Sequence, residues 1–512
     1  MNEDGLSRRA ILGGGSIAVL GAAVAPAAMA QDNLVPVRID IRRKTGPLPH
    51  IWKECVGSDR AAITLRESWR NDLRRWTSEA GTQRVRFHGI FADEMAVMTP
   101  TILNRGKLTP NFQRVDQVYD GLLANNVKPF VELSFMPKGL AAGTTSFFFY
   151  GGIITPPKAN DAWADFIKAF VTHLVARYGL AEVRQWPFEV WNEPNLSVFW
   201  TGTKEQYFEF YRVTALAIKS IDSQIQVGGP STASVEWIAD FASYCASSNT
   251  PVDFFTTHVY AGDSQDKLFG KGSARSSQND VIPRAIRQAR GQIDASPFAG
   301  KPLWITEWSS DSPAMITHVI KESLPYCQAM SPWVMSCEYE ELGIADYILK
   351  EGDSGWGMIS AGIAKPSFNT YKLLHALGPE RLEADGPVLA SRREDGMIAA
   401  LVWNLADVTQ PSGIPGLSHS RSVRGEAKSL VVDIAGARPG QSVSVRYVDQ
   451  ERGSPMPAWR EMGSPQYPSR QQIDTLRQRA DIAPAQKMRL DRQGRLTLSL
   501  PPEGVALLEL QG

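Results

Sequence analysis

Two glutamates follow apolar stretches of similar character, and their positions suit acid–base chemistry. Glu193 comes in the turn directly after the strand-like stretch 188–191 and is followed by a turn-forming proline. Glu307 comes after a second apolar run, 302–306, and has Trp308 beside it. Apolar and aromatic neighbours raise the pKa of a carboxyl group, because they disfavour its charged form. Two carboxyl groups with different pKa values can act on opposite sides of one reacting atom, as hydrolysis of a glycosidic bond requires.

Such a pair needs a fold that brings two distant strand ends together. Between Cys55 and Leu377, short β-rich runs alternate with longer amphipathic ones, of which Asp161–Tyr178 and Glu205–Ile221 are the clearest helices. The eight expected strands are Glu54–Gly57, Arg84–His88, Lys128–Ser134, Pro187–Trp191, Gln224–Gly228, Asp253–Tyr260, Pro302–Thr306 and Trp333–Tyr339. Eight strands with helical crossovers predict an α/β fold, a (β/α)₈ TIM barrel over residues 51–377, with a doubly wound open sheet as the alternative.

A closed barrel would bring the two glutamates to one place. Glu193 ends the fourth expected strand and Glu307 ends the seventh. These strands face one another across a barrel, and α/β barrels carry their chemistry at the carboxyl ends of the strands. We therefore expect both carboxyl groups at the barrel mouth. Either glutamate alone could simply cap a turn, but two of them on these two strands argue against that interpretation.

The remainder of the chain has a different sequence pattern, without the alternation of strands and helices. Residues 378–512 contain short strand-like runs separated by Gly, Pro and Asp, which predicts an accessory β-sandwich. Its expected strands are Val388–Ser391, Met397–Asn404, Ser429–Ile434, Ser442–Val448, Leu496–Leu500 and Val505–Leu510. Within residues 31–50, the alternating run Val35–Ile41 is expected to join that sandwich. The polar stretch Arg460–Ala485 is interpreted as a surface excursion with one helix.

Residues 1–30 have the composition of an export signal. Paired arginines, Arg8 and Arg9, precede a mild apolar run, and Ala28–Ala30 offers small residues around a cleavage point. The pair indicates a twin-arginine type of signal, which predicts a periplasmic or secreted protein. No later stretch is long and apolar enough to span a membrane. The four cysteines, Cys55, Cys245, Cys327 and Cys337, are expected to be free thiols.

Composition excludes several classes of partner. Lys and Arg number 54, as do Asp and Glu, so the net charge is near zero and nucleic acid is not an expected partner. The sequence has no His/Cys cluster of the kind that binds zinc and no glycine-rich phosphate loop outside residues 1–30. We therefore expect neither a metal nor a cofactor.

Several motifs in a fixed order resemble those of glycoside hydrolase family 39, a family of retaining barrel glycosidases in clan A that includes β-xylosidases. The stretches are 86–91, 130–137, 191–195, 257–260, 306–308, 339–343 and 362–366. The resemblance implies that Glu193 is the acid/base and Glu307 the nucleophile. A retaining mechanism needs the two carboxyl groups about 5–5.5 Å apart.

The same resemblance implies a set of substrate contacts. Asn192 would bond the sugar 2-hydroxyl, and Tyr260 would donate its hydroxyl to Glu307. One of Glu340 and Glu341 would bind the 3- or 4-hydroxyl, while the other caps a loop. The remaining candidates are two histidines for ring hydroxyls and two tryptophans for stacking or core packing: His88, His258, Trp308 and Trp356.

The expected function is release of xylose from the non-reducing ends of β-1,4-xylo-oligosaccharides. Three alternatives keep the chemistry and change the substrate: an α-L-arabinosidase, an iduronidase-like enzyme, or an endo-hydrolase of exopolysaccharide. A uronic acid substrate would need a cation near its carboxyl group, which the motifs do not clearly offer. A carbohydrate-binding protein on an inactive barrel is a further alternative, although the presence of both Glu193 and Glu307 argues against it. The sequence does not predict the oligomeric state.

Overall fold

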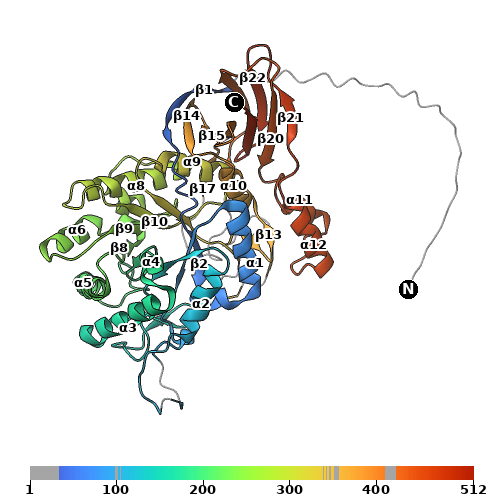
Figure 1. Cartoon of the computed structure of the whole chain (residues 1–512). Helices are drawn as coiled ribbons and strands as arrows, with labels where there is room; N and C mark the ends of the chain where they lie inside the picture. The colour runs from blue at the N-terminus through green and yellow to red at the C-terminus, as the bar shows by residue number, and fades with distance from the viewer. Residues whose placement is uncertain are drawn as a thin grey trace, which may run out of the picture.

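The computed structural model describes residues 34–98, 102–103, 105–337, 340–341, 343–344, 347–350, 357–409 and 422–512. A barrel surrounded by helices lies beside a smaller domain made mainly of strands (Figure 1). The predicted signal, residues 1–30, lies outside the described residues, and so does Trp356. Over the described part of the chain, no helix has the length and apolar character that a membrane span requires.

Eight parallel strands form the barrel, as predicted. In hydrogen-bonding order they are β2 (Val56–Arg60), β3 (Arg84–His88), β4 (Lys128–Glu132), β7 (Phe188–Glu189), β8 (Val227–Thr232), β9 (Phe254–His258), β10 (Leu303–Trp308) and β11 (Ala329–Pro332). Two hydrogen bonds join β11 and the residues after it to the start of the sheet, from Met330 N–H to Ile51 O and from Met335 N–H to Gly57 O, each 2.9 Å. These bonds close the sheet, so the open-sheet alternative does not apply.

Helices pack around the strands because each buries one apolar face. In α3, Trp163, Phe166, Phe170 and Leu174 recur every three or four residues and are all buried. The capping box of Thr203 and Gln206 begins α5. The helices of the barrel are α1 (Glu67–Arg75), α2 (Gln113–Leu123), α3 (Asn160–Tyr178), α4 (Leu180–Val183), α5 (Lys204–Ile221), α6 (Ile238–Ser247), α7 (Gln265–Phe269), α8 (Gln278–Asp294), α9 (Pro313–Ser323) and α10 (Pro366–His375).

The accessory domain is built on a nine-stranded sheet. Its order is β21 (Gln486–Arg489), β20 (Ser442–Val448), β23 (Val505–Gln511), β16 (Met397–Trp403), β15 (Val388–Arg392), β14 (Glu380–Asp385), β1 (Leu34–Pro47), β19 (Lys428–Ala435) and β22 (Arg495–Leu500). β1 pairs with β14 on one side and with β19 on the other, so the first described strand lies inside a sheet formed by the last part of the chain. Two helices, α11 (Met456–Glu461) and α12 (Arg470–Arg479), follow β20.

Alternation along β16 explains how the two domains share their packing. Ile398, Ala400 and Val402 point into the core of the accessory domain. The intervening residues, Ala399, Leu401 and Trp403, belong to the core of the barrel. Because successive side chains of a strand point to opposite faces, one strand contributes to both cores. The accessory sheet is thus packed against the barrel by its other face.

The eighth strand differs from its prediction. The expected range was Trp333–Tyr339, but β11 is Ala329–Pro332 and ends before it. Pro332 cannot donate a hydrogen bond to a ladder, so it is a natural last residue for the strand. Trp333, Val334 and Met335 are buried nonetheless, which is why their apolar character was misleading. Three short pairs of strands lie outside the two large sheets: β5 (Ser146–Phe147) with β6 (Gly152–Ile153), β12 (Ile359–Ser360) with β13 (Ile363–Ala364), and β17 (Asp407–Thr409) with β18 (Ser422–Arg424).

Candidate active site

Glu193 is presented by a tight turn at the end of β7. The backbone of Glu193 has a φ of 43° and that of Trp191 a φ of 74°, in the left-handed region that non-glycine residues rarely adopt. The N–H of Glu193 donates to the carbonyl of Ser231 (2.8 Å), and the indole N–H of Trp191 donates to the carbonyl of Phe199 (2.8 Å). These bonds hold the turn, and the side chain of Glu193 is almost buried, with 9% of the residue exposed.

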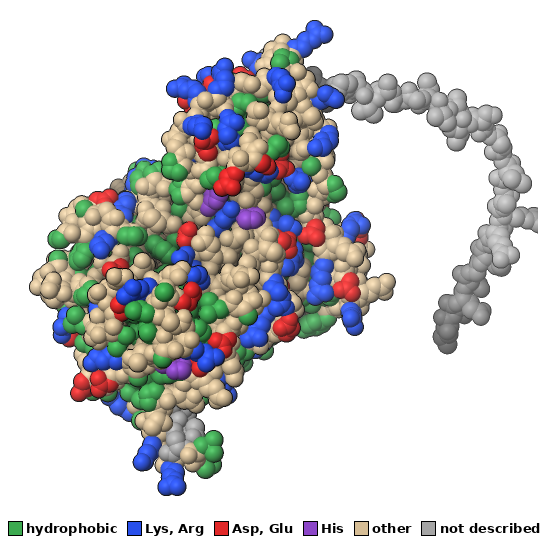
Figure 2. Space-filling view, viewed as in Figure 1, with side chains coloured by type: hydrophobic (Ala, Val, Ile, Leu, Met, Phe, Trp, Pro, Cys, Tyr) green, Lys and Arg blue, Asp and Glu red, His purple; other side chains and the backbone are tan. Residues whose placement is uncertain are grey.

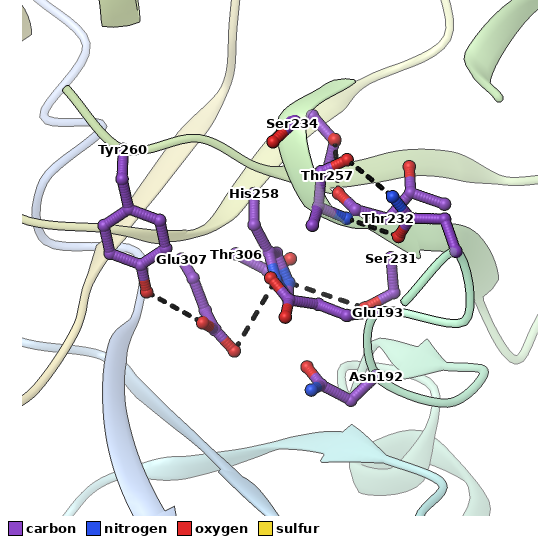
Figure 3. A network of polar contacts seen from close by, with 12 residues as sticks. Asn192, Glu193, Ser231, Thr232, Ser234, Thr257, His258, Tyr260, Thr306 and Glu307 are labelled. Atoms are coloured by element: carbon purple, nitrogen blue, oxygen red, sulfur yellow. Dashed lines mark hydrogen bonds and ion pairs between the residues drawn. The ribbon is translucent and has the colours of Figure 1, made fainter. Parts of the chain in front are cut away.

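Glu307 lies within β10, next to His258 of β9 in the strand register. Its Oε1 accepts a hydrogen bond from Nη1 of Arg86 (2.8 Å), and its Oε2 accepts one from the hydroxyl of Tyr260 (2.9 Å). Figure 3 shows Tyr260 pointing at Glu307 from one side while Glu193 and His258 lie on the other. Two donors of this kind favour the ionised carboxylate. The predicted hydrogen bond from Tyr260 to Glu307 is therefore present.

The two carboxyl groups come close together at the barrel mouth. One oxygen of Glu193, one oxygen of Glu307 and a ring nitrogen of His258 all lie within 4.8 Å of one another. This closeness is consistent with the separation of about 5–5.5 Å used by retaining glycosidases, and it is shorter than the separation of roughly 6.5–9.5 Å that is typical of inverting ones. The pair can therefore act on the two sides of a single anomeric carbon without an intervening water.

His258 is a neutral hydrogen-bond donor to Glu193. Its Nε2 lies 3.4 Å from Nη2 of Arg86, which can only donate, so Nε2 carries the lone pair. Nδ1 then carries the proton and donates to Oε1 of Glu193 at 2.9 Å. Burial, followed by the charges of Arg86 and His88, holds the pKa of His258 well below its usual value. One ring nitrogen of His258 and one oxygen of each glutamate are potential metal ligands, and Nδ1 of His258 is engaged with Glu193.

Arg86, on β3, organises the floor of the site and is fully buried. Its guanidinium contacts three carboxylates: Glu132 at 2.8 Å, Glu189 at 2.6 Å and Glu307 at 2.8 Å. Burial opposes its charge, yet these carboxylates raise the pKa of Arg86 well above its usual value. One cation thus faces several acids, so the site holds a surplus of negative charge that a further carboxyl group would increase.

Glu193 retains its proton in this negatively charged site. Burial is the largest cause that raises the pKa of Glu193 well above 4.5, and the charges of Glu307 and Asp263 add to it. Arg86 opposes the shift but does not reverse it. A carboxyl group that stays protonated near neutral pH can donate a proton to a leaving oxygen. The environment therefore separates the roles of the two glutamates, one acidic and one anionic.

Asn192 and His88 complete the wall around the pair. Oδ1 of Asn192 accepts a hydrogen bond from Nη2 of Arg86 (3.0 Å), so its amide N–H₂ group is turned the other way. His88 bonds to Glu132 through Nδ1 at 2.8 Å. Its Nε2 lies 3.7 Å from Oε1 of Glu307 and 3.4 Å from Oε1 of Glu341. The structure thus brings Asn192, His88 and Glu341 to the carboxyl pair.

Two predicted residues lie elsewhere. Glu340 faces Arg60 and Arg66, and both guanidinium groups bond its carboxylate, with distances of 2.5–3.0 Å. Trp308 is 0% exposed and belongs to the core of the barrel, so the prediction of a stacking face was wrong and core packing, its alternative, is correct. The period-two alternation of β10 explains this, because Trp308 points away from the side on which Glu307 lies.

Four residues of the site were not singled out from the sequence. Arg86, Glu189, Trp333 and Asp263 are charged or aromatic residues that only the fold brings to the glutamates. The ring of Trp333 lies 4.7 Å from that of His88, centroid to centroid. Gly57 makes room for it, since a Cβ there would come within 2.5 Å of the Trp333 ring. The available signal was Arg86 itself, a charge between two apolar residues of a predicted strand.

An aromatic hairpin walls the site on the side of β4. The ring of Phe148 stacks near His88, with centroids 5.8 Å apart and planes at 17°. The next residue, Phe149, is 63% exposed, and its N–H donates to the carbonyl of Glu341 at 2.6 Å. This bond joins the loop after β4 to the segment that follows β11. The loop after β4 thus brings aromatic side chains to the edge of the site beside His88.

Charges on the visible surface are mixed. Lys and Arg side chains lie interspersed with Asp and Glu over both domains on the face in Figure 2. Large single-sign fields, by contrast, are what attract nucleic acids and other polyanions. The face in Figure 2 therefore offers no support for a polyanionic partner, which agrees with the near-zero net charge.

Comparisons with known proteins give a consistent result. The sequence profile of glycosyl hydrolases family 39 matches residues 35–497. A β-xylosidase of Geobacillus stearothermophilus is 33% identical over 483 residues, which cover 90% of this chain and 92% of that protein. The α-L-iduronidase of Homo sapiens is 25% identical over 474 residues, covering 82% of this chain and 68% of that protein.

Solved structures agree with the sequence relatives. The crystal structure of a monomeric β-xylosidase from Caulobacter crescentus CB15 matches with a TM-score of 0.81 and 32% identity, covering 93% of this chain and 99% of that one. The structure of the family 39 enzyme from Xanthomonas axonopodis pv. citri matches with a TM-score of 0.79 and 31% identity. Barrel and accessory domain are thus shared over nearly the whole length of the chain.

Proposed function

The chain belongs to glycosyl hydrolases family 39, and on that premise we propose that it is a retaining exo-β-1,4-xylosidase. Its substrates would be xylo-oligosaccharides, from whose non-reducing ends it releases xylose. The observation that carries the proposal is the close pair of Glu193 and Glu307, whose oxygens lie within 4.8 Å at the mouth of the barrel. The names of the relatives at 32–33% identity support xylose as the sugar.

In the first step, Glu307 attacks the anomeric carbon and Glu193 gives its proton to the leaving oxygen. Arg86 and Tyr260 keep Glu307 anionic and aimed, each through one hydrogen bond. His258 donates a hydrogen bond to Oε1 of Glu193, so the acidic proton of Glu193 resides on the other oxygen, Oε2. The bond to the leaving oxygen breaks, and a glycosyl ester forms on Glu307.

In the second step, a water molecule hydrolyses that ester. Formation of the ester removes the charge of Glu307, which is one of the causes that raise the pKa of Glu193. Glu193 has by then lost its proton to the leaving group and can stay deprotonated, so it accepts a proton from the attacking water. Two inversions at the anomeric carbon give net retention.

Asn192 is the residue proposed to hold the 2-hydroxyl of the sugar. Because Arg86 fixes its carbonyl oxygen, the amide N–H₂ group is presented as a donor of fixed orientation. A hydrogen bond to the 2-hydroxyl strengthens as the oxocarbenium-like transition state forms, so it lowers the barrier by more than it stabilises the bound substrate.

The loop after β4 supports exo action, because its Phe148 stacks near His88 and its Phe149 N–H bonds to the carbonyl of Glu341. A uronic acid substrate is less well supported. Its carboxylate would need a cation, and among the described residues beside the site Arg60, Arg66 and Arg86 are each bonded to carboxylates. An arabinopyranoside of the α-L series shares the ring pattern of β-xylose except at one hydroxyl, so slower cleavage of it is expected.

A panel of 4-nitrophenyl glycosides tests the substrate. We expect the β-D-xylopyranoside to have the highest kcat/KM, the α-L-arabinopyranoside a lower one and the α-L-iduronide no measurable turnover. Xylotetraose should give xylose and xylotriose first, with no early xylobiose. Full activity in a chelator is expected, because no step requires a metal. A higher kcat/KM for the iduronide than for the xyloside, or xylobiose among the first products, would contradict the proposed specificity.

We also propose that residues 1–30 direct export and are removed. The paired arginines Arg8 and Arg9 and the small residues Ala28–Ala30 support this. Cleavage after Ala30 would leave β1 whole. N-terminal sequencing of the protein recovered from the periplasm or the medium tests it, together with an Arg8→Lys/Arg9→Lys variant, which should stay in the cytoplasm.

A further inference from the structure

Asp263 lies in the loop after β9 and bonds both to Tyr260 of this first loop and to Ser234 of a second loop, which follows β8. Its Oδ2 accepts the N–H of Tyr260 at 3.1 Å and the O–H of Ser234 at 3.1 Å. Its own N–H donates to the carbonyl of Tyr260 at 3.0 Å. Residues 260–263 therefore form a turn that is closed on both sides, with the backbone of Tyr260 held by two bonds.

The first loop leads to Glu307. Tyr260 donates its hydroxyl to Oε2 of Glu307 at 2.9 Å. A tyrosine ring has only two side-chain torsions, so the place of its hydroxyl is set closely by the place of its backbone. By fixing the backbone of Tyr260, Asp263 fixes the direction from which Glu307 receives this hydrogen bond.

The second loop leads to Glu193. Segment 231–235 consists of the last two residues of β8 and the turn that follows it, and it contains three non-glycine residues with φ between 55° and 59°: Ser231, Ser234 and Val235. Each such residue costs about 1–2 kcal/mol, so contacts from elsewhere must hold the segment in place. Asn195 supplies two of them, through both backbone groups of Ala233 (2.8 and 3.1 Å). Asp263 supplies another through Ser234.

Segment 231–235 in turn supports the turn that carries Glu193. The carbonyl of Ser231 accepts the N–H of Glu193 at 2.8 Å. Glu193 itself has a φ of 43°, a conformation that depends on such support. Figure 3 shows Ser234, Thr232 and Ser231 lying on the side of Glu193 and His258 away from Tyr260. The carboxylate of Asp263 is thus connected to both glutamates by hydrogen bonds: to Glu307 through Tyr260, and to Glu193 through segment 231–235.

We propose that Asp263 is a positioning residue for both carboxyl groups, which holds Tyr260 against Glu307 and holds segment 231–235 behind Glu193. This role presupposes the proposed glycosidase function and adds to it a residue that touches neither substrate nor reacting atom. Because Asp263 acts on Glu307 through Tyr260, its removal should lower kcat/KM much less in a protein that lacks the hydroxyl of Tyr260.

The charge of Asp263 gives a second readout. After burial and Glu307, Asp263 is the next cause that raises the pKa of Glu193. Burial raises the pKa of Asp263 itself to about 6, so it is ionised where Glu193 loses its proton at higher pH. The other charged or titratable groups that face these two carboxyl groups are Glu307, Arg86, Glu132, His258, Lys267 and Glu236.

A double-mutant cycle tests the proposal. Asp263→Ala, Tyr260→Phe and the double variant are compared with the unaltered protein on 4-nitrophenyl β-xyloside. We expect Asp263→Ala to lower kcat/KM about tenfold in the unaltered background and by less than about threefold in the Tyr260→Phe background. An equal loss in both backgrounds would overturn the proposal, since a merely structural role does not depend on the tyrosine hydroxyl.

Asp263→Asn separates the charge from the bonds, because an amide oxygen can still accept from Tyr260 and Ser234. Its alkaline limb of kcat/KM should move to lower pH by about half a unit, as Glu193 loses a neighbouring charge. Because these bonds remain, Asp263→Asn should keep most of its kcat/KM, and a loss as large as that of Asp263→Ala would overturn the proposal. Should Asp263→Ala fail to fold, Ser234→Ala replaces it, with an expected loss of about threefold and a normal melting temperature; no loss would overturn the proposal.

The matched control is Asp266→Ala, three residues further along the chain, in the first turn of α7. Asp266 pairs with Arg275 at 3.0 Å on the surface, and its removal should leave activity and the pH profile unchanged. If the unaltered protein and this control do not cleave the xyloside, the proposed sugar is wrong. The same cycle is then run on the glycoside of the panel that is cleaved fastest, where the tyrosine dependence still decides the role of Asp263.

Discussion

At the residue scale, the chemistry comes from unequal surroundings of two glutamates. Glu307 receives hydrogen bonds from Arg86 and Tyr260, which favour its charge. Glu193 has no cation of its own, lies buried, and feels the charge of Glu307, so its pKa is raised well above 4.5. The same side chain type is therefore an anion at one strand end and an acid at the other. Environment, not residue type, assigns the roles.

Removing the nucleophile should abolish turnover without unfolding the chain. In Glu307→Gly, Arg86 keeps its contacts with Glu132 and Glu189, so the buried cation stays paired. We expect kcat on 4-nitrophenyl β-xyloside to fall by roughly a thousandfold or more. The melting temperature should stay within a few degrees of that of the unaltered protein. Substantial hydrolysis by a folded variant would refute the assignment of Glu307.

Removing the acid/base should leave a defect that azide repairs. With 2,4-dinitrophenyl β-xyloside the leaving group needs little protonation, so Glu193→Ala should still form the ester on Glu307 and then stall. Azide fits the space left by the missing carboxyl group and needs no base, so it should restore turnover and give β-xylosyl azide. Product analysis by mass and NMR checks this, and Glu307→Gly should give no β-azide.

The raised pKa of Glu193 also predicts a pH dependence of stability. The folded chain keeps this proton up to a pH well above 4.5, whereas the unfolded chain loses it near 4.5. Stability from this group is complete below about pH 4.5 and is lost as the pH rises through the folded-state pKa. Glu193→Gln has no such group. Its melting temperature relative to the unaltered protein should therefore increase from pH 5 to pH 8, and a constant difference would contradict the shift.

At the scale of elements, the strands and helices with strong apolar patterns were predictable. β3 and β20 have the predicted bounds, and α3 begins within one residue of its prediction. β14 and β21 were missed because their burial is weak: only Leu382 is buried in β14, and no residue is in β21. Strands with so little burial form because neighbouring strands pair with them, and a local sequence pattern carries no information about those neighbours.

The candidate site was predictable to the extent that it follows strand ends. Glu307 and His258 lie in strands, Tyr260 and Glu193 follow strand ends closely, and the barrel brings the four together as expected. Asp263 lies in a loop whose path no periodicity describes, and so its bonds to Tyr260 and Ser234 could not be foreseen. Trp308 was misassigned because a tryptophan beside a catalytic glutamate suggests stacking, whereas its direction in β10 places it in the core.

β1 offers a test at this scale. It pairs with β14 along one side and β19 along the other, and its Val37 and Ile39 are buried in the core of the accessory domain. A chain that begins at residue 48 would expose both neighbouring strands and that core, so we expect it to be insoluble. A chain that begins at residue 31 should be soluble with one cooperative melting transition. A soluble, well-folded chain from residue 48 would contradict this role of β1.

At the scale of the molecule, the barrel and the accessory domain share their packing. β23 repeats the arrangement of β16: Ala506, Leu508 and Leu510 point into the accessory core, and Val505 and Leu507 into the core of the barrel. The first described strand and the last one lie in the same sheet. Figure 1 shows this sheet beside the end of the barrel near α9 and α10. The accessory domain therefore buttresses the barrel, while the mouth of the barrel carries the chemistry.

The central claim is that Glu193 and Glu307 together perform a double displacement, and the stereochemistry of the product tests it most directly. Hydrolysis of 4-nitrophenyl β-xyloside is followed by ¹H NMR from the first turnovers, before mutarotation mixes the anomers. Two carboxyl groups whose oxygens lie within 4.8 Å predict that β-xylose appears first and converts slowly to the α anomer. If α-xylose appears first, the reaction inverts, and Glu307 is not a nucleophile.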